Sequence, residues 1–317
     1  MMDLGHRLTD KELEKLEKKI QKEYGQASRE MEAKLKTHLA KFQKRDAEKK
    51  LAVNRGELSR RDYLEWREKA MMRNQQWIDL RKNLARDMQN ANQIAKSIAN
   101  GYMPDVYALN HNWGTYEVES GLRIDTNYAM YSRETVERLL KDDPDILPPP
   151  GKNKKVQAGK ALKWHEGQIQ SVTLQSILQG ESIPHTAQRI AKTLGVKGTK
   201  SSVLYARTAV TGAQNAGRRD AYNRARDLGI EIENEWMATP DDRTRPSHVD
   251  ADGERRAEGE RFSTGCLYPG DPTGPAEEVW ACRCTMVAAI KGYKYNDDRF
   301  TRLPAGMSFD DWRNMHD

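Results

Sequence analysis

The sequence lacks several features that mark common protein classes. It has no run of 18 apolar residues, so we expect no membrane span. The first residues, Met1 to His6, lack the apolar core of a secretory signal, which makes secretion an unfavoured destination. Three cysteines, an odd number, argue against a disulfide framework and favour a reducing compartment. There is also no glycine-rich nucleophile turn, no H-E-x-x-H and no phosphate loop.

Polar and charged residues dominate the 317-residue chain. Only 37% of the residues are hydrophobic, 32% are charged, and the mean hydropathy is −0.91. This composition is too polar for one large globule and favours long solvated helices with one or two modest cores. The length leaves room for about two domains.

The net charge of +6 is unevenly distributed. Between Gly151 and Arg226 there are 14 Lys and Arg residues against three Asp and Glu residues, an excess of +11, so the remainder is net acidic. This stretch, the basic block, predicts a polyanionic partner, either nucleic acid or an acidic protein surface. A solvated helical face is the alternative. The residues expected to contact such a partner are Lys152, Lys154, Lys155, Arg218 and Arg219.

Two long helices are predicted before residue 101. Thr9 to Glu12 has the capping-box pattern, and apolar residues then recur every three or four positions up to Phe42. Ser59 begins a second such stripe, for which Asn100-Gly101 is the predicted end. We therefore expect a long N-terminal helical hairpin that buries its stripes internally or against a partner, and a scaffold role for it.

The rest of the chain alternates between helices and short strands. Further helices are predicted after Pro104 and Ser132, over 161–179, from Ser182 to Gly195, and from Ser201 to Leu228. Strands are predicted over 230–238, 254–262 and 285–290, with a hairpin turn at Asp252-Gly253, and a short helix after Ser308. The expected fold class is mainly α with a C-terminal α+β domain.

These elements predict five segments along the chain. They are a helical arm over 1–101, an aromatic-rich connection over 102–150, a basic helical region over 151–228, an α+β domain over 229–295 and a polar tail over 296–317. The aromatic residues of the second segment could stack on bases, but few basic residues accompany them. A packed core or a protein interface is the favoured interpretation.

The stretch from Trp236 to Cys284 concentrates the residues that could carry chemistry. One interpretation is a zinc site, because His248, Cys266, Cys282 and Cys284 offer one imidazole and three thiolates. Their spacing fits no familiar finger, and Cys282 and Cys284 would need an unusual bend to share one ion. The alternative is a set of small buried cysteines beside a hydrogen-bonded histidine, with no metal.

Catalysis and a purely structural role are the other interpretations. His248 lies near Asp241, Asp242 and Asp250 in the sequence, so it is a general-base candidate for a nuclease or a transferase. The structural interpretation is the one we favour. There the two aspartates accept backbone amides in a turn, an arginine pairs with a carboxylate, and the histidine ties the loop to the closing strand. The residues of this structural loop are Asp241, Asp242, Arg243, Arg245, His248, Cys282 and Cys284.

The same residues resemble a known family. The strings Asp241–His248, Asp252-Gly253, Tyr268–Asp271 and Cys282–Cys284, with the helix Ala206–Asn215 before them, resemble the phage Mu protein F-like minor head proteins, or head morphogenesis proteins. The specific similarity covers roughly residues 200–290, and the two long N-terminal helices carry no diagnostic motif.

The resemblance implies a non-enzymatic virion component. Such a protein would join the head in the host cytoplasm during procapsid assembly, bind the phage portal protein at the portal vertex inside the capsid, and contact capsid or scaffolding proteins and double-stranded DNA. No membrane partner and no cofactor is implied, apart from zinc. Some relatives carry a fuller Cys/His set, of which this chain retains only a part. The alternative function is a nucleic-acid-binding protein or a metal-dependent nuclease that uses the loop of His248 and Asp241.

Overall fold

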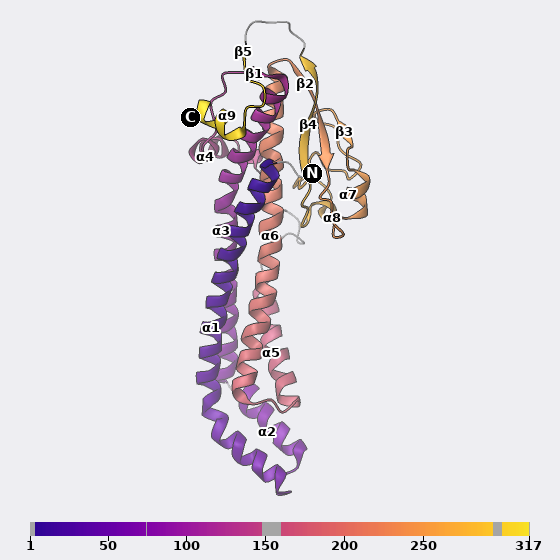
Figure 1. Cartoon of the computed structure of the whole chain (residues 1–317). Coiled ribbons are helices and arrows are strands. Elements are labelled where there is room, and N and C mark those ends of the chain that lie inside the picture. The colour runs from indigo at the N-terminus through magenta and orange to yellow at the C-terminus, as the bar shows by residue number, and fades with distance from the viewer. Residues whose placement is uncertain (1–3, 74, 148–159, 294–299, 317) are drawn as a thin grey trace. The chain divides into compact units, whose positions relative to one another are not determined.

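The computed structural model describes residues 4–73, 75–147, 160–293 and 300–316 (Figure 1). Its helices are α1 (Leu4–Asn54), α2 (Arg60–Met72), α3 (Gln75–Leu122), α4 (Arg133–Asp142), the 3-10 turn η1 (Pro144–Ile146), α5 (Leu162–Leu178), α6 (Ile183–Asp227), α7 (Pro246–Asp250), α8 (Ala276–Val279) and α9 (Phe309–His316). Its strands are β1 (Ile124–Asp125), β2 (Ile230–Met237), β3 (Arg255–Arg256), β4 (Thr285–Tyr293) and β5 (Thr301–Arg302).

The chain folds into two compact units. Unit 1 comprises residues 1–17, 98–157 and 204–317, and unit 2 comprises residues 18–97 and 158–203. The five predicted segments do not coincide with these units, because the long helices α1, α3 and α6 each contribute residues to both.

Unit 2 is helical, and apolar stripes build its core. The stripe of α1 is fully buried within the unit at Ile20, Met31, Leu35 and Leu39. Tyr24 of α1 hydrogen-bonds Ser202 of α6 at 2.8 Å and also bonds Asn92 of α3, which brings three helices together. The predicted amphipathic helices therefore cover one another, as the spacing of their apolar residues requires.

Unit 1 contains the two sheets. Strand β2 lies between β3 and β4, antiparallel to both, and a bulge interrupts the β2–β4 register at Glu231/Ile232. The buried residues of β2 alternate, with Ile230, Ile232 and Trp236 facing the core. Strands β1 and β5 form a separate two-stranded sheet.

The aromatic-rich residues after 102 form a packed core in unit 1. Trp113 and Tyr128 cluster with Phe309 and Trp312 of α9, and the ring centroids of Tyr128 and Trp312 are 5.8 Å apart. The Trp312 indole donates a hydrogen bond of 2.6 Å to Glu119. These rings are buried against each other, so the expectation of a core is confirmed and base stacking is not supported.

The structure confirms several predicted elements. The fold class is mainly α with a small C-terminal sheet region, and α1, α5, β2, β4 and α9 lie where the sequence patterns place them. Ser59 and Ser132 cap α2 and α4, each accepting a backbone amide. Among the described helices, none combines the length and apolarity needed to cross a membrane.

Other predicted boundaries are wrong. Helix α1 begins at Leu4, before the predicted cap. The hydroxyl of Thr9 donates to the carbonyl of Gly5 inside the helix, so Thr9 does not cap its first turn. The second long stripe divides into α2 and α3, and α3 runs through Asn100-Gly101 and Pro104.

The later boundaries need correction as well. α6 runs through Gly195 without a break, so the two helices predicted for this part of the chain are one. The strand predicted over 254–262 is only the two-residue β3.

Candidate functional site

One face of α6 holds the Cys-x-Cys segment through its backbone. Thr211 donates a hydrogen bond of 2.7 Å to the carbonyl of Cys282. Asn215 donates to the carbonyl of Cys284 at 3.2 Å and accepts the amide of Met286 at 2.8 Å. Spacings of three and four place these side chains on one stripe of the helix. The stripe begins at Thr208 and ends at Arg218, which bonds the carbonyl of Met286 at 2.9 Å.

A sharp turn precedes the two cysteines. Ala281 has a φ of 56°, in the left-handed region that residues other than glycine rarely adopt. Its amide donates to the hydroxyl of Thr208 at 2.9 Å, so α6 also stabilises this strained position. The chain then runs extended into β4, where alternate side chains share a face. Cys282 and Cys284 therefore point to one side and Arg283 to the other. The turn at Ala281 supplies the bend, and the extended segment after it puts both sulfurs on the same side.

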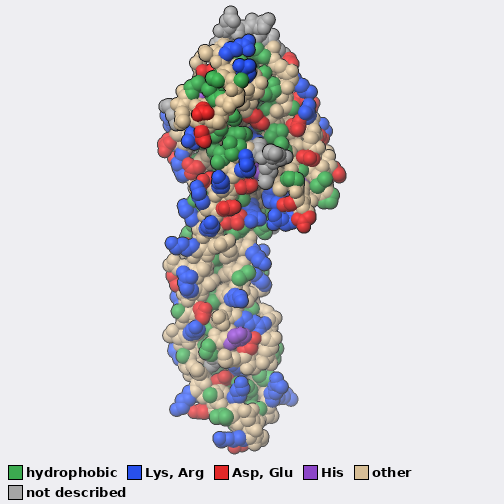
Figure 2. All heavy atoms as spheres, in the orientation of Figure 1, with side chains coloured by type: hydrophobic (Ala, Val, Ile, Leu, Met, Phe, Trp, Pro, Cys, Tyr) green, Lys and Arg blue, Asp and Glu red, His purple; other side chains and the backbone are tan. Residues whose placement is uncertain are grey.

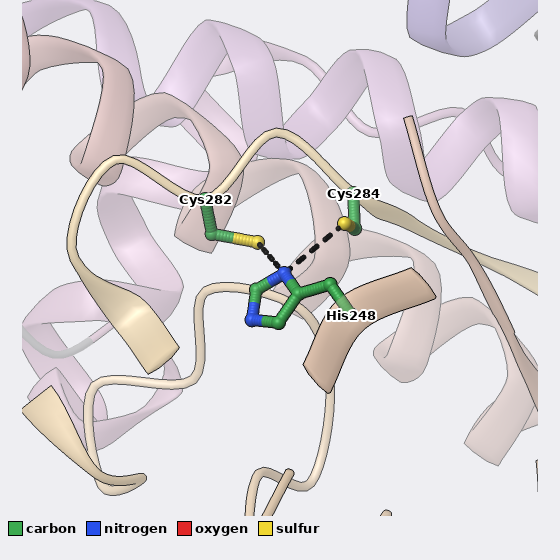
Figure 3. A group of neighbouring side chains, drawn as sticks. All are labelled: His248, Cys282 and Cys284. Carbon is green, nitrogen blue, oxygen red and sulfur yellow. Dashed lines mark hydrogen bonds between the residues drawn. The ribbon is translucent and has the colours of Figure 1, made fainter. Parts of the chain in front are cut away.

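His248 lies between the two sulfurs (Figure 3). Its Nδ1 is 3.3 Å from the Sγ of Cys284 and 3.8 Å from the Sγ of Cys282. These three atoms all lie within 4.8 Å of one another. The three residues are 1%, 1% and 2% exposed for His248, Cys282 and Cys284, so the group is closed to bulk water.

The two thiols differ in acidity. A hydrogen bond from the Cys282 thiol lowers the pKa of Cys284, against the opposing effect of burial. The same hydrogen bond, together with burial, raises the pKa of Cys282 well above its usual value.

Glu278 of α8 faces the other side of the imidazole. Its Oε2 lies 2.9 Å from the Nε2 of His248, at ion-pair distance although not aligned as a hydrogen bond. Ser247 donates 2.9 Å to the same carboxylate oxygen and keeps it in place. A carboxylate beside Nε2 favours the tautomer that carries its proton there and leaves the Nδ1 lone pair facing the sulfurs.

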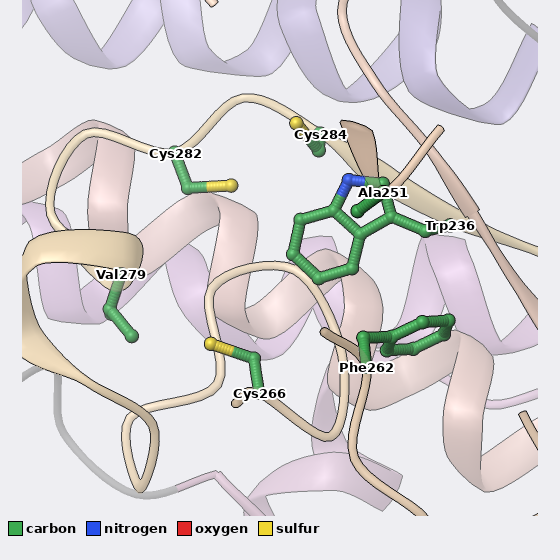
Figure 4. Close-up of a cluster of buried hydrophobic side chains, with 7 residues drawn as sticks. All are labelled: Trp236, Ala251, Phe262, Cys266, Val279, Cys282 and Cys284. Atoms are coloured by element: carbon green, nitrogen blue, oxygen red, sulfur yellow. The ribbon is translucent and has the colours of Figure 1, made fainter. Parts of the chain in front are cut away.

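Cys282 and Cys284 belong to an apolar cluster of unit 1 (Figure 4). Trp236 and Phe262 pack with ring centroids 5.2 Å apart, and Trp236 also lies edge-on to His248 at 5.1 Å. Cys266 belongs to this cluster but not to the group of three ligand atoms. Burial raises the pKa of Cys266 to about 12. The expected four-residue ligand set is therefore reduced to three, because the loop of Cys266 presents its sulfur to Gly274 instead.

The loop between β2 and α7 is tied to the same segment. Arg283 makes a two-pronged pair with the carboxylate of Asp241, one nitrogen lying 2.6 Å from Oδ1. Asp241 also accepts the amide of Arg243 at 3.0 Å. Hydrogen bonds from Arg283 lower the pKa of Asp241 far below its usual range. Sequence reasoning proposed Arg243 or Arg245 as the partner of a carboxylate. Arg243 does contact Asp241, at 3.3 Å, whereas Arg245 bonds the carbonyl of Trp280.

Asp242 is exposed, and Asp241 is engaged by arginines. His248 is buried among the cysteines and Glu278. The structure therefore does not assemble His248 and Asp241 into a general-base pair, and the loop that carries the two residues is held from both ends.

A second loop packs directly on α6. Gly270, with a φ of 81°, approaches so closely that a Cβ there would lie 3.0 Å from the backbone nitrogen of Gly212. The buried carboxylate of Asp271 holds this loop by accepting the amides of Leu267 at 2.9 Å and Thr273 at 2.8 Å. Gly212 and Gly270 both need to be glycine, because a side chain on either residue would keep the two backbones apart.

The Asp241 loop also borders a cleft of about 370 Å³ in unit 1. Residues of α1 and α6 line its other walls. Burial raises the pKa of Asp10 in this cleft. Arg207 pairs with Glu17 at 2.6 Å at its edge. With both acidic and basic side chains in its wall, the cleft has no single charge sign that would select a polyanion.

The predicted contacts of the basic block need correction. Arg218 is fully buried and bonded to unit 1 backbone, so it is not available to DNA or a portal surface. Arg219 pairs with Glu258, as does Arg226 at 3.2 Å. Lys152, Lys154 and Lys155 lie outside the described residues. On the face drawn in Figure 2, basic and acidic side chains are interspersed instead of forming one basic patch.

Sequence reasoning missed the residues that hold the site. Thr208, Thr211 and Asn215 were assigned to a helix without a function of their own. A signal was present, since three polar residues recur on the otherwise Ala- and Gly-rich face of a buried helix. A polar residue on such a face requires a partner, and backbone groups of irregular loops are the usual one.

The comparison with protein families covers the residues of this site. Residues 167–287 match the family model described as phage Mu protein F like protein. The minor head protein GP7 of Bacillus phage SPP1 is 27% identical over 214 residues, covering 63% of this chain and 67% of that protein. An NAD(+)–arginine ADP-ribosyltransferase of Enterococcus faecalis is 28% identical over 168 residues, covering 49% of this chain and 34% of that enzyme. No solved structure matches.

Proposed function

Because residues 167–287 carry a domain of the phage Mu protein F-like family, we propose that this chain is a virion protein that binds the portal vertex during head assembly. Membership of that family points to head morphogenesis in general. The portal as partner, the position inside the capsid and assembly in the host cytoplasm are the specific parts of the proposal.

The similarity to a minor head protein is the observation that carries the proposal. It extends over 214 residues, well beyond the family domain, so it includes helices outside residues 167–287. The matched part of the ADP-ribosyltransferase is about a third of that enzyme. Its activity therefore gives weaker support to an enzymatic role than GP7 gives to a structural one.

Outward-facing side chains are the proposed portal contacts. The apolar stripes of unit 2 are buried inside the unit, so they are not free to pack against portal subunits as the sequence alone allowed. Exposed lysines of the basic block remain, among them Lys192 and Lys200 on α6. These two residues suit an acidic protein surface, and a rim of such charges governs association rate and salt dependence.

Co-purification of the full-length chain with the portal protein of the same phage tests this function. Deleting residues 1–100 would be a poor test, since it also removes residues 1–17 from unit 1. We expect Lys192→Glu with Lys200→Glu to weaken the complex. Lys82→Glu with Lys96→Glu, two exposed lysines of α3 outside the block, is the matched control. No complex with the unaltered chain would refute the portal role.

DNA contact is a second proposed function of the same lysines. It predicts an affinity for duplex DNA that falls steeply with salt, and a slope reduced by about two in the double Lys192/Lys200 variant. Salt-insensitive or absent binding would leave the portal as the partner of the basic block.

We further propose that the protein has no catalytic turnover. The rival enzyme, a nuclease or a transferase, would use His248 with Asp241, and these residues serve different contacts. Incubation with DNA and Mg²⁺, or with NAD(+), should give the same background for the wild type and His248→Ala. A His248-dependent product would overturn this part.

A further inference from the structure

We propose that His248, Cys282 and Cys284 bind one thiophilic d10 cation, zinc in the first place, in a structural site of unit 1. The proposal concerns only these residues and does not depend on the portal or DNA. Two thiolates and one imidazole are the ligand types that zinc prefers in proteins.

The spacing of the three atoms fits such an ion. With Zn–S about 2.3 Å and Zn–N about 2.0 Å, a tetrahedral ion separates a sulfur and a nitrogen ligand by roughly 3.5 Å. The two Nδ1–Sγ distances are 3.3 and 3.8 Å, one on each side of that value. Small side-chain rotations would therefore place all three atoms around one cation.

Both sulfurs lie close to the same imidazole nitrogen. A neutral imidazole nitrogen that faces the sulfurs has one lone pair, so it accepts one thiol proton. Two sulfurs nevertheless converge on the Nδ1 of His248, and the longer distance is that of a weak contact. A cation uses both sulfurs and the same lone pair at once.

The surroundings supply what a metal ligand needs. Glu278 faces the Nε2 of His248 and holds the tautomer in which Nδ1 is free to bind, as carboxylates do beside many zinc-bound histidines. The cluster of Trp236 and Phe262 keeps the group dry. A cation with charge +2 and two thiolates is neutral overall, which suits an apolar environment.

Binding is balanced by proton release. The two cysteines bind zinc as thiolates, so any thiol proton that the pair carries passes to solvent, while His248 keeps its Nε2 proton. The site joins α7, which carries His248, to the turn before β4, which carries the cysteines. Zinc therefore fixes the Asp241 loop and the Cys-x-Cys segment to each other. Cys266 stays outside the ligand set.

The test uses the full-length chain with its thiols reduced, titrated with Zn²⁺ and, for absorption, with Co²⁺. We expect one ion per chain and thiolate-to-cobalt charge transfer. Cys282→Ser and Cys284→Ser should each abolish the binding of one ion per chain. Cys266→Ser, the matched control, should retain one ion per chain. Glu278→Gln should lower the affinity about tenfold to a hundredfold at unchanged stoichiometry.

A measurement on the unaltered protein guards against misfolded variants. Bound Zn²⁺ should protect Cys282 and Cys284 from alkylation, as read by mass spectrometry, and leave the rate at Cys266 unchanged. Substoichiometric zinc, equal zinc content in the Cys282→Ser/Cys284→Ser variant, or unprotected alkylation of both cysteines would overturn the proposal. Loss of zinc in Cys266→Ser with wild-type folding would overturn the three-residue set.

Discussion

Different interactions stabilise the interior of each unit. In unit 2, aliphatic side chains at helical spacing are buried against each other, as with Met31, Leu35 and Leu39 of α1. In unit 1, polar side chains of α6 bind the backbone of irregular segments, as Asn215 does with Pro269, Cys284 and Met286. Burial of apolar area is insensitive to small shifts, whereas hydrogen bonds to backbone fix a loop in one position.

The difference is one of degree, since unit 2 also contains a buried charged side chain. Arg67 is 1% exposed and pairs with Asp46 at 2.7 Å. It also donates 2.5 Å to the carbonyl of Glu181. The units differ in what their buried polar side chains bind. In unit 1 those of α6 bind the backbone of the Cys-x-Cys segment and fix its position.

The largest effect that would sharpen this comparison is expected from Asn215→Ala. The change leaves the buried carbonyls of Pro269 and Cys284 and the amide of Met286 without their partner. We expect unit 1 to lose about 3 kcal/mol or more, because each unsatisfied buried group costs about 1–3 kcal/mol. Hydrogen exchange read by mass spectrometry should show faster exchange in β4 and unchanged exchange in the unit 2 part of α3.

The exposed Asn83 of α3 provides the control for that experiment. Asn83→Ala should change stability by no more than about 0.5 kcal/mol. Equal loosening of both units in Asn215→Ala would contradict the view that α6 acts locally on the loops of unit 1.

A medium effect is expected from acid on unit 2. Burial lowers the pKa of His165 to about 4, below its usual value of 6.5. A depressed histidine pKa means that the unfolded chain takes up the proton first as the pH falls. The stabilisation is therefore complete above pH 6.5 and is lost progressively down to about pH 4, up to about 3 kcal/mol.

His165→Gln should remove this pH dependence from α5. Urea unfolding followed by hydrogen exchange in α5, at pH 7 and pH 4.5, measures it. The control is His185→Gln, at a side chain that is 60% exposed. An acid loss in α5 that persists in His165→Gln would show that the buried imidazole is not its origin.

The smallest effect should be equal in the two units. Ser59 caps α2 in unit 2 and Ser132 caps α4 in unit 1, each through a hydroxyl that accepts an amide. Replacing either by alanine should cost about 1 kcal/mol. Shifts in urea midpoint should be similar, while Ser171→Ala, exposed within α5, should be neutral or slightly stabilising. A large inequality would mean that the caps also carry tertiary contacts.

The sequence predicted most where a single period repeats. The stripes of α1 and α3 and the alternation of β2 follow from spacing alone. It failed where glycine was interpreted as a helix end. A Cβ at Gly195 would lie 2.0 Å from the hydroxyl of Ser28, and one at Gly198 would lie 2.5 Å from the ring of Tyr24. These glycines allow α1 and α6 to pack closely within unit 2.

The candidate site could be predicted in kind but not in geometry. Residue types indicated that His248 and the cysteines would tie a loop to a strand. The left-handed turn at Ala281, the pair of Asp241 with Arg283 and the separate position of Cys266 depend on contacts far apart in the sequence. Local patterns carry no information about such partners.

Unit 1 brings together residues that are far apart in the sequence. Gln214 bonds His6 at a separation of 208 residues, and Trp312 bonds Glu119 at a separation of 193. Contacts so remote along the chain slow folding, because a long loop must close before they form. The aromatic core of unit 1 combines residues of α3 with residues of α9, so it forms only after the 193 residues that separate Glu119 from Trp312 have been synthesised.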